Sequence, residues 1–110
     1  MKYIITEDQL NLIKEENILS FPFEFFNNDW DLVLSSMKGR PFSIQGDLTL
    51  FGVPVKSLGN LQSVEGSLNL SGLKIKTLSH LKSVGKNLNL IFSKIENLGD
   101  LEYIGGSLYA

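Results

Sequence analysis

The chain repeats one pattern of apolar residues every 20 positions, from residue 46 to residue 110. Six columns of the pattern hold only leucine, isoleucine or valine through three full repeats: Leu48, Leu68 and Leu88; Leu50, Leu70 and Leu90; Val55, Ile75 and Ile95; Leu58, Leu78 and Leu98; Leu61, Leu81 and Leu101; and Val64, Val84 and Ile104. No insertion breaks this register, so each 20-residue unit is predicted to form one coil of a repeat fold.

Two spacings alternate within each coil. The x-L-x-L part alternates with period two, which predicts a short strand with one buried face over residues 47–51, 67–71, 87–91 and 107–110. The L-x-x-L-x-x-[VI] part has period three, which favours a 3₁₀-like or irregular return arm. Glycine precedes three of the four strands, at Gly46, Gly66 and Gly106, where the chain must bend, and Lys86 fills the same column in the third coil.

A coil of this kind has one apolar side that it cannot bury alone. Stacking the coils buries all six columns in one core and brings the strands into a parallel sheet, about 4.8 Å apart. We therefore expect an α+β fold: a short, leucine-rich-repeat-like parallel β-solenoid of about three coils plus a terminal strand, capped at the N-terminus by two helices.

The cap is expected in residues 1–45, which do not fit the repeat. Residues 2–5 are a candidate short strand. Thr6 and Gln9 have the spacing of a capping box, which predicts a helix over 7–17 with Leu10 and Ile13 on its apolar face. Asn28 as a cap and Gly39 as a stop predict a second helix over 28–38.

Between these helices lies an aromatic run, residues 21–26, in which Pro22 blocks a helix. The large aromatic side chains of the run and of the second helix are expected to pack in the core and cover the first coil: Phe21, Phe23, Phe25, Phe26 and Trp30. Residues 1–45 and the solenoid of residues 46–110 are expected to form one compact domain.

The repeat resembles the leucine-rich-repeat family, and most closely the short repeats of receptor L-type domains, in strings such as SVEGSLNL and YIGGSLYA. The phrase KSLGNLQSVEGSLNL is also similar to the 20-residue repeats of small phage and bacterial proteins. The resemblance covers residues 46–110 and implies recognition of partners rather than chemistry. It departs from the family at the asparagine column, which holds Val53, Leu73 and Ser93.

Composition excludes several classes of function. A net charge of −2 argues against a nucleic-acid binder, which normally carries a basic surplus. The chain has no cysteine and one histidine, so a disulfide scaffold and a Cys- or His-based metal site are not expected, and no cofactor is predicted. Neither a signal peptide nor a membrane span is evident, and a cytoplasmic protein is the simplest interpretation, the host cytoplasm if a phage encodes it.

Catalysis has one candidate. His80 lies on the return arm in the same column as Asp100, one coil away, so the two side chains are predicted to be able to touch. A hydrolase would also need a serine nucleophile, and neither a nucleophile elbow nor an oxyanion loop is present. We expect a protein that is not an enzyme.

A protein partner is expected on the sheet face, where the residues between the buried leucines point outward. Polar groups dominate there, and a few apolar or aromatic side chains resemble binding anchors. The predicted contact residues are Thr49, Phe51, Asn69, Asn89, Ile91, Phe92 and Tyr109. The alternative is that Phe51 and Phe92 pack into turns. Lysines also share columns, at Lys56 and Lys76 and at Lys74 and Lys94, and form a stripe suited either to solubility or to an acidic partner.

The last coil ends within its strand, which leaves two interpretations open. The chain is a part of a longer ladder, or its open end pairs with another chain through Leu101, Ile104, Leu108 and Ala110. The leading function is a non-catalytic protein–protein interaction module, and the resemblance to small phage proteins favours an inhibitor of a host protein. The alternative is an assembly protein that forms homo-oligomers through this end.

Overall fold

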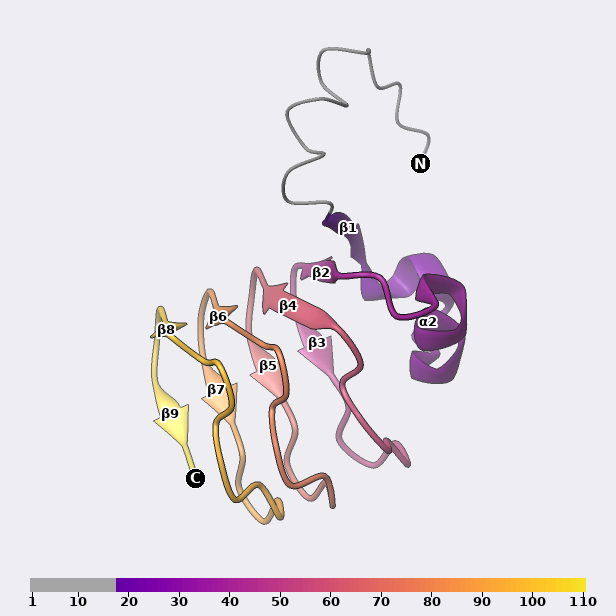
Figure 1. Ribbon diagram of the computed structural model, residues 1–110. Coiled ribbons are helices and arrows are strands. Elements are labelled where there is room, and N and C mark those ends of the chain that lie inside the picture. Colours follow the sequence, from indigo (N-terminus) through magenta and orange to yellow (C-terminus); the bar gives the residue numbers. More distant parts are fainter. Residues whose placement is uncertain (1–17) are drawn as a thin grey trace.

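The computed structural model describes residues 18–110, which form an α+β fold with one α-helix and two parallel sheets. The chain crosses from one sheet to the other and back in every coil (Figure 1). Sheet A contains β1 (Leu19–Pro22), β2 (Phe42–Gln45), β4 (Leu61–Val64), β6 (Ser83–Val84) and β8 (Tyr103–Ile104), in that order. Sheet B contains β3 (Leu48–Thr49), β5 (Leu68–Asn69), β7 (Leu88–Asn89) and β9 (Leu108–Tyr109).

The 20-residue register of the sequence is also the pairing register of sheet B and, between β4, β6 and β8, of sheet A. In sheet B, Leu48 pairs with Leu68, Leu68 with Leu88, and Leu88 with Leu108. In sheet A, Val64 pairs with Val84, and Val84 with Ile104. The predicted strands therefore form, although each is shorter than the alternation suggested, because the chain turns again two residues after entering sheet B.

The apolar columns meet between the two sheets. Leu48, Leu68 and Leu88 are fully buried, as are Leu58 and Leu78 from the turn that leads back to sheet A. Burying a side chain of this size contributes about 1.5–3 kcal/mol, so the repeated columns account for most of the hydrophobic stabilisation.

The expectation of a 3₁₀-like or irregular return arm holds in part: the residues before Leu61 are irregular, no 3₁₀ segment is present within residues 46–110, and the end of the arm is a strand. After an irregular turn at Gly59 and Asn60, residues Leu61–Val64 are extended and pair with β2 on one side and β6 on the other. The period of three spans the turn and the strand together, so it does not describe a helical repeat. Backbone groups that a 3₁₀ helix would satisfy within one coil are satisfied here by the neighbouring coil, as when Glu65 N donates to Ile44 O (2.9 Å).

Sheet A also extends beyond the repeat that the sequence displays. β2 pairs with β4 so that Ser43 lies beside Ser63 and Ile44 beside Val64, which is the same 20-residue step. The string SIQG at residues 43–46 is thus the structural counterpart of SVEG at 63–66.

The cap contains one α-helix within the described residues. The predicted helix over 28–38 is present as α2 (Trp30–Met37), whose N-cap is Asp29 rather than Asn28. Its carboxylate accepts a hydrogen bond from Leu32 N (3.2 Å), whereas Asn28 lies in the left-handed region at φ 55°. The predicted strand 2–5 and helix 7–17 lie outside the described residues.

The aromatic run packs as predicted, with one exception. Phe21, Phe23 and Trp30 are buried, and a short 3₁₀ helix, η1 (Phe23–Phe26), carries the chain around them. Phe26 is partly buried against the core, but Phe25 is 54% exposed, so the prediction that it packs in the core is wrong. In a four-residue turn that has one face on the core, not every aromatic side chain can point inward.

The cap is joined directly to the first coil. Trp30 Nε1 donates to Ser57 O (2.9 Å), and the ring of Phe42 in β2 stacks on Phe21 with centroids 5.8 Å apart. α2 lies at this end of the molecule, on the side of the first coil (Figure 1). No helix within residues 18–110 has the length and hydrophobicity that a membrane crossing requires.

Candidate partner-binding surface

The predicted contact residues lie on sheet B and on the turn that follows each of its strands. Thr49 and Tyr109 are exposed, and Tyr109 retains 46% of its surface. Asn69, Asn89 and Ile91 are half-buried. Phe51 and Phe92, which lie in the turns of the first and third coils, are 64% and 88% exposed.

The two asparagines have a local role that the sequence did not reveal. Asn69 Oδ1 accepts a hydrogen bond from Ser71 N (3.0 Å), and Asn89 Oδ1 accepts one from Ile91 N (2.9 Å). Each is an Asx turn, in which the side chain replaces a backbone carbonyl and reverses the chain two residues later. Asn69 positions the turn of the second coil and Asn89 the turn that carries Ile91 and Phe92, so their substitution would disturb structure as well as any contact.

Phe92 is the least expected residue on this surface. The corresponding positions of the first two coils are Gly52 and Gly72, both at φ +77°. Phe92 adopts the same left-handed conformation at φ +61°, although a side chain with a Cβ is disfavoured there by roughly 1–2 kcal/mol. Because its ring is 88% exposed, packing of the side chain does not offset this cost.

The turn bearing Phe92 is held by the second coil. Ser71 Oγ and Gly72 N both donate to the Ile91 carbonyl oxygen, at 3.0 and 2.9 Å. The alternative interpretation, in which Phe51 and Phe92 tuck into the turns as packing, disagrees with their exposure. Both rings are exposed, and the turn that carries Phe92 is held by hydrogen bonds from the second coil.

A shallow hollow adjoins these turns. It has a volume of about 420 Å³ and is lined by the turn residues of the first two coils: Gly52, Val53, Pro54, Val55, Lys56, Gly72, Leu73 and Lys74. The two lysines are exposed at its margin. The surface therefore combines exposed aromatic side chains, an apolar hollow and positive charge.

A second polar column, on sheet A, was not singled out from the sequence. Ser43, Ser63 and Ser83 pair across β2, β4 and β6, and Ser63 Oγ lies 2.8 Å from Ser43 Oγ. They line a hollow of about 510 Å³ together with Tyr103 of β8, which is 60% exposed. The sequence signal that could have identified this serine column is the recurrence of Ser-Val at 63–64 and 83–84.

His80 and Asp100 approach each other as predicted. Nδ1 of the histidine lies 3.7 Å from Oδ2 of the aspartate, and both side chains are 62% exposed. Solvent screens such a pair, so it is a weak surface contact. Within residues 18–110, no three histidine, cysteine or carboxylate side chains cluster as metal ligands would.

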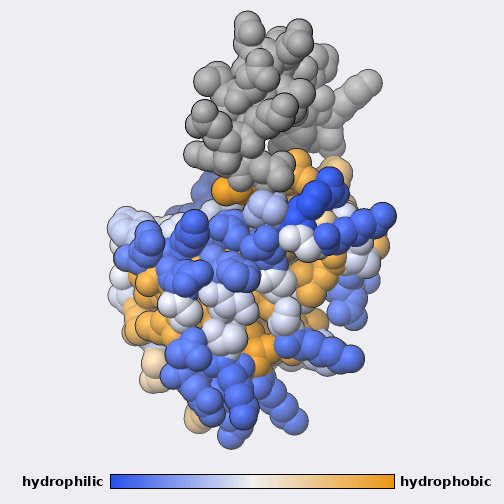
Figure 2. Space-filling view, viewed as in Figure 1, coloured by the Kyte–Doolittle hydropathy of each residue, from blue (hydrophilic) through white to orange (hydrophobic). Residues whose placement is uncertain are grey.

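The four residues predicted to form an oligomer interface all lie in or after the third coil. Leu101 and Ile104 are half-buried, Leu108 is 46% exposed and Ala110 is exposed. Their counterparts Leu81, Val84 and Leu88 are fully buried. Apolar surface is visible along the side of the molecule that carries β8 and β9 (Figure 2).

Comparisons of the chain with protein-family models, with curated proteins and with solved structures gave no match.

Proposed function

We propose that this chain is a non-catalytic protein–protein interaction module, in which the stacked coils form a leucine-rich-repeat type of solenoid. The 20-residue pairing register and the buried leucine columns support the solenoid assignment. Its sheet B face and the adjoining turns bind a partner protein. The resemblance of the repeat to those of small phage and bacterial proteins favours an inhibitor that occludes a host protein.

Phe92 is the observation that carries this proposal. Phe92 has an 88% exposed side chain and a backbone conformation that favours glycine, so it lowers the stability of the free protein. Large aromatic side chains are the residues that most often dominate binding energy at interfaces. A partner pocket that takes up this ring is the simplest reason for its presence where the other coils have Gly52 and Gly72.

The surface around Phe92 indicates the kind of partner. The hollow at the first two turns is apolar, and Lys56 and Lys74 stand at its margin, with Lys76 and Lys94 exposed in the same columns. A protein surface with an apolar pocket and acidic residues around it is complementary to this arrangement.

Phe92→Gly tests the proposal. The variant removes the ring and relieves the backbone, so the free energy of unfolding is expected to stay equal or to rise by about 1 kcal/mol. Affinity capture from the native host, followed by mass spectrometry, should identify a partner with the wild-type chain and lose it with the variant.

Lys38→Gly is the matched control, because Lys38 also has a left-handed backbone (φ 53°) but lies after α2, in the cap. It should gain similar stability and retain the partner. If Phe92→Gly retains the partner as well, Phe92 is not the anchor.

A second candidate function is self-association through the last coil. Leu98 is 40% exposed and Leu108 46% exposed, whereas the matching leucines of the preceding coils are fully buried. The proposed interface contains Leu101, Ile104, Leu108 and Ala110, and a second copy would cover this apolar surface.

A further inference from the structure

The turn after each strand of sheet B and the first residues of the arm that follows it form one long edge of the molecule. We call this surface the turn edge, and its residues are 51–56, 71–76 and 91–96. It lies at the lower end of the coils in Figure 1, away from the strands of sheet A. The coils stay in step here, because Gly72 N donates to Ile91 O (2.9 Å) and Lys94 N donates to Leu73 O (2.8 Å). Equivalent residues of neighbouring coils therefore lie side by side, about 4.8 Å apart.

Positive charge is concentrated on the turn edge. Residues 18–110 contain eight Lys and Arg side chains and eight Asp and Glu side chains, and the turn edge holds half of the cations but only one carboxylate, that of Glu96. The cations are Lys56, Lys74, Lys76 and Lys94, all of them exposed. Hydrophilic side chains project from this edge in Figure 2.

The charges of these lysines are not balanced by carboxylates of the described chain. Among residues 18–110, none of the four lysines forms an ion pair. Lys74 and Lys94 also occupy the same position of neighbouring coils, and like charges placed opposite each other in neighbouring strands are unfavourable. Carboxylates supplied by a partner would relieve this repulsion.

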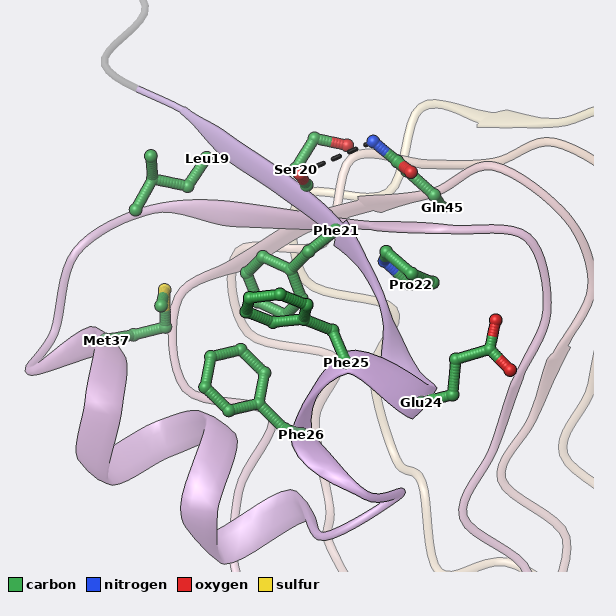
Figure 3. Close-up of a pocket in the computed structure, with 9 residues that line it drawn as sticks. All are labelled: Leu19, Ser20, Phe21, Pro22, Glu24, Phe25, Phe26, Met37 and Gln45. Carbon is green, nitrogen blue, oxygen red and sulfur yellow. Dashed lines mark hydrogen bonds between the residues drawn. The ribbon is translucent and has the colours of Figure 1, made fainter. Parts of the chain in front are cut away.

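Two phenylalanines on the turn edge are exposed without the packing that supports an exposed ring elsewhere. Phe25, in the cap, is 54% exposed, but its ring centroid lies 6.3 Å from that of Phe21 and 5.1 Å from that of Phe26 (Figure 3). Phe51 and Phe92 are 64% and 88% exposed, and no aromatic ring of residues 18–110 packs against either. Phe25 thus belongs to an aromatic cluster, whereas the two rings of the turn edge stand among lysines.

The hollow on the turn edge limits what can bind there. It spans the first two coils, with a volume of about 420 Å³, and Lys56 and Lys74 are among its lining residues. A Cβ added at Gly52 or Gly72, which also line it, would meet no atom within 4 Å, so the space at both glycines is open. An α-helix is about 10–12 Å across with its side chains, which is too wide for a hollow over two coils that are about 4.8 Å apart. One large apolar side chain of an extended segment can enter it.

We propose that the turn edge binds a linear acidic segment of the partner protein, an extended stretch in which one large apolar residue lies between acidic residues. The apolar side chain enters the hollow, and the carboxylates pair with Lys56 and Lys74 at its margin and with Lys94 in the next coil. This inference rests on the proposed function, because it names the chemistry of the partner for the same surface. The charges select the partner and speed its association, and the buried apolar side chain supplies affinity.

A synthetic peptide tests this chemistry directly. The probe is the fluorescein-labelled heptapeptide EEELEEE, and fluorescence anisotropy measures its binding to the full chain at low ionic strength, where charges are least screened. Two control peptides each remove one feature: QQQLQQQ removes the charge and EEESEEE removes the apolar side chain. Each control should bind about tenfold more weakly than the probe. Equal binding of EEELEEE and EEESEEE would show a general attraction for polyanions and would overturn the proposal, as would no binding of EEELEEE at millimolar concentration.

Charge reversal locates the binding site. The double variant Lys74→Glu with Lys94→Glu reverses two lysines of the turn edge, and Lys82→Glu with Lys86→Glu makes the same change of net charge outside it. All four side chains are exposed, so both double variants are expected to fold. The turn-edge variant should weaken binding of EEELEEE by about tenfold or more, and the control variant by less than about threefold. Equal losses would contradict a site on the turn edge.

Affinity capture separates this inference from the proposed function. A partner that is lost with Phe92→Gly but retained with Lys74→Glu and Lys94→Glu would leave the proposed function in place and overturn the acidic segment. A partner that is retained with Phe92→Gly but lost with the lysine double variant would overturn Phe92 as the anchor and support the acidic segment.

Discussion

At the scale of single residues, the same position of the repeat serves different purposes in different coils. Gly52 and Gly72 fit the left-handed backbone of their turns, while Phe92 occupies it against its preference. Asn69 and Asn89 hold those turns through their side chains, while Thr49 in the same column is exposed. The repeated residues determine the backbone of each coil. Residues that depart from the repeat, such as Phe92, are therefore the first candidates for a binding role.

Asn69→Ala is expected to lower the free energy of unfolding by about 1 kcal/mol, because the Ser71 amide loses its acceptor. Asn69→Asp keeps a side-chain oxygen at that position and should recover most of the loss. Urea denaturation measures both variants. Thr49→Ala, in the corresponding position of the first coil, should be close to neutral. Equal losses for alanine and aspartate would show that the Asx turn is not what Asn69 contributes.

At the scale of elements, α2 is the part of the described cap that depends most on one polar side chain. Asp29 accepts from Leu32 N and closes the first turn, and Asp31 adds a second acidic group at the same helix end. Trp30 follows directly and donates to the Ser57 carbonyl oxygen, so the start of the helix also fixes the contact with the first coil.

Asp29→Ala should therefore cost about 1 kcal/mol of stability. Asn28→Gly is its control, because glycine suits the φ of 55° at that residue and the sequence alone had marked Asn28 as the cap. Thermal unfolding monitored by circular dichroism compares the two. If Asn28→Gly lowers the stability and Asp29→Ala does not, then Asn28 and not Asp29 is the N-cap.

At the scale of the whole molecule, the two ends of the coil stack are unlike. Trp30 and Val33 of α2 pack against the core at the first end, with 2% and 0% exposure. At the other end, Leu98 and Leu108 are partly exposed. A head-to-tail contact between copies would have to displace the helix, so a symmetric tail-to-tail dimer is the geometry that self-association through the last coil would take.

Leu108→Asp decides whether the last coil self-associates. If it does, light scattering of the 110-residue chain should give a dimer mass at high micromolar concentration, and the variant should give a monomer mass. Leu108 is 46% exposed, so a charge there is tolerated in a monomer far better than at the fully buried Leu88. A wild-type chain that remains monomeric at that concentration would exclude this function.

The sequence by itself determined the coil and its register. Leucines spaced by 20 residues can share one core only if successive coils stack in step, and Leu48, Leu68, Leu88 and Leu108 pair in that way. It also located α2 and most of the buried aromatic residues, because their periodicity and capping signals are local.

Only the tertiary structure decided how the return arm folds, which phenylalanines are exposed, and what the polar columns do. The arm becomes sheet A because its hydrogen-bond partners come from coils 20 residues away, which a local pattern does not contain. Phe21 and Phe25 look alike in sequence, yet one is buried and the other is half-exposed, since burial depends on which side of the chain faces the core. The left-handed backbone of Phe92 is set in the same way, by the turn that the second coil holds in place.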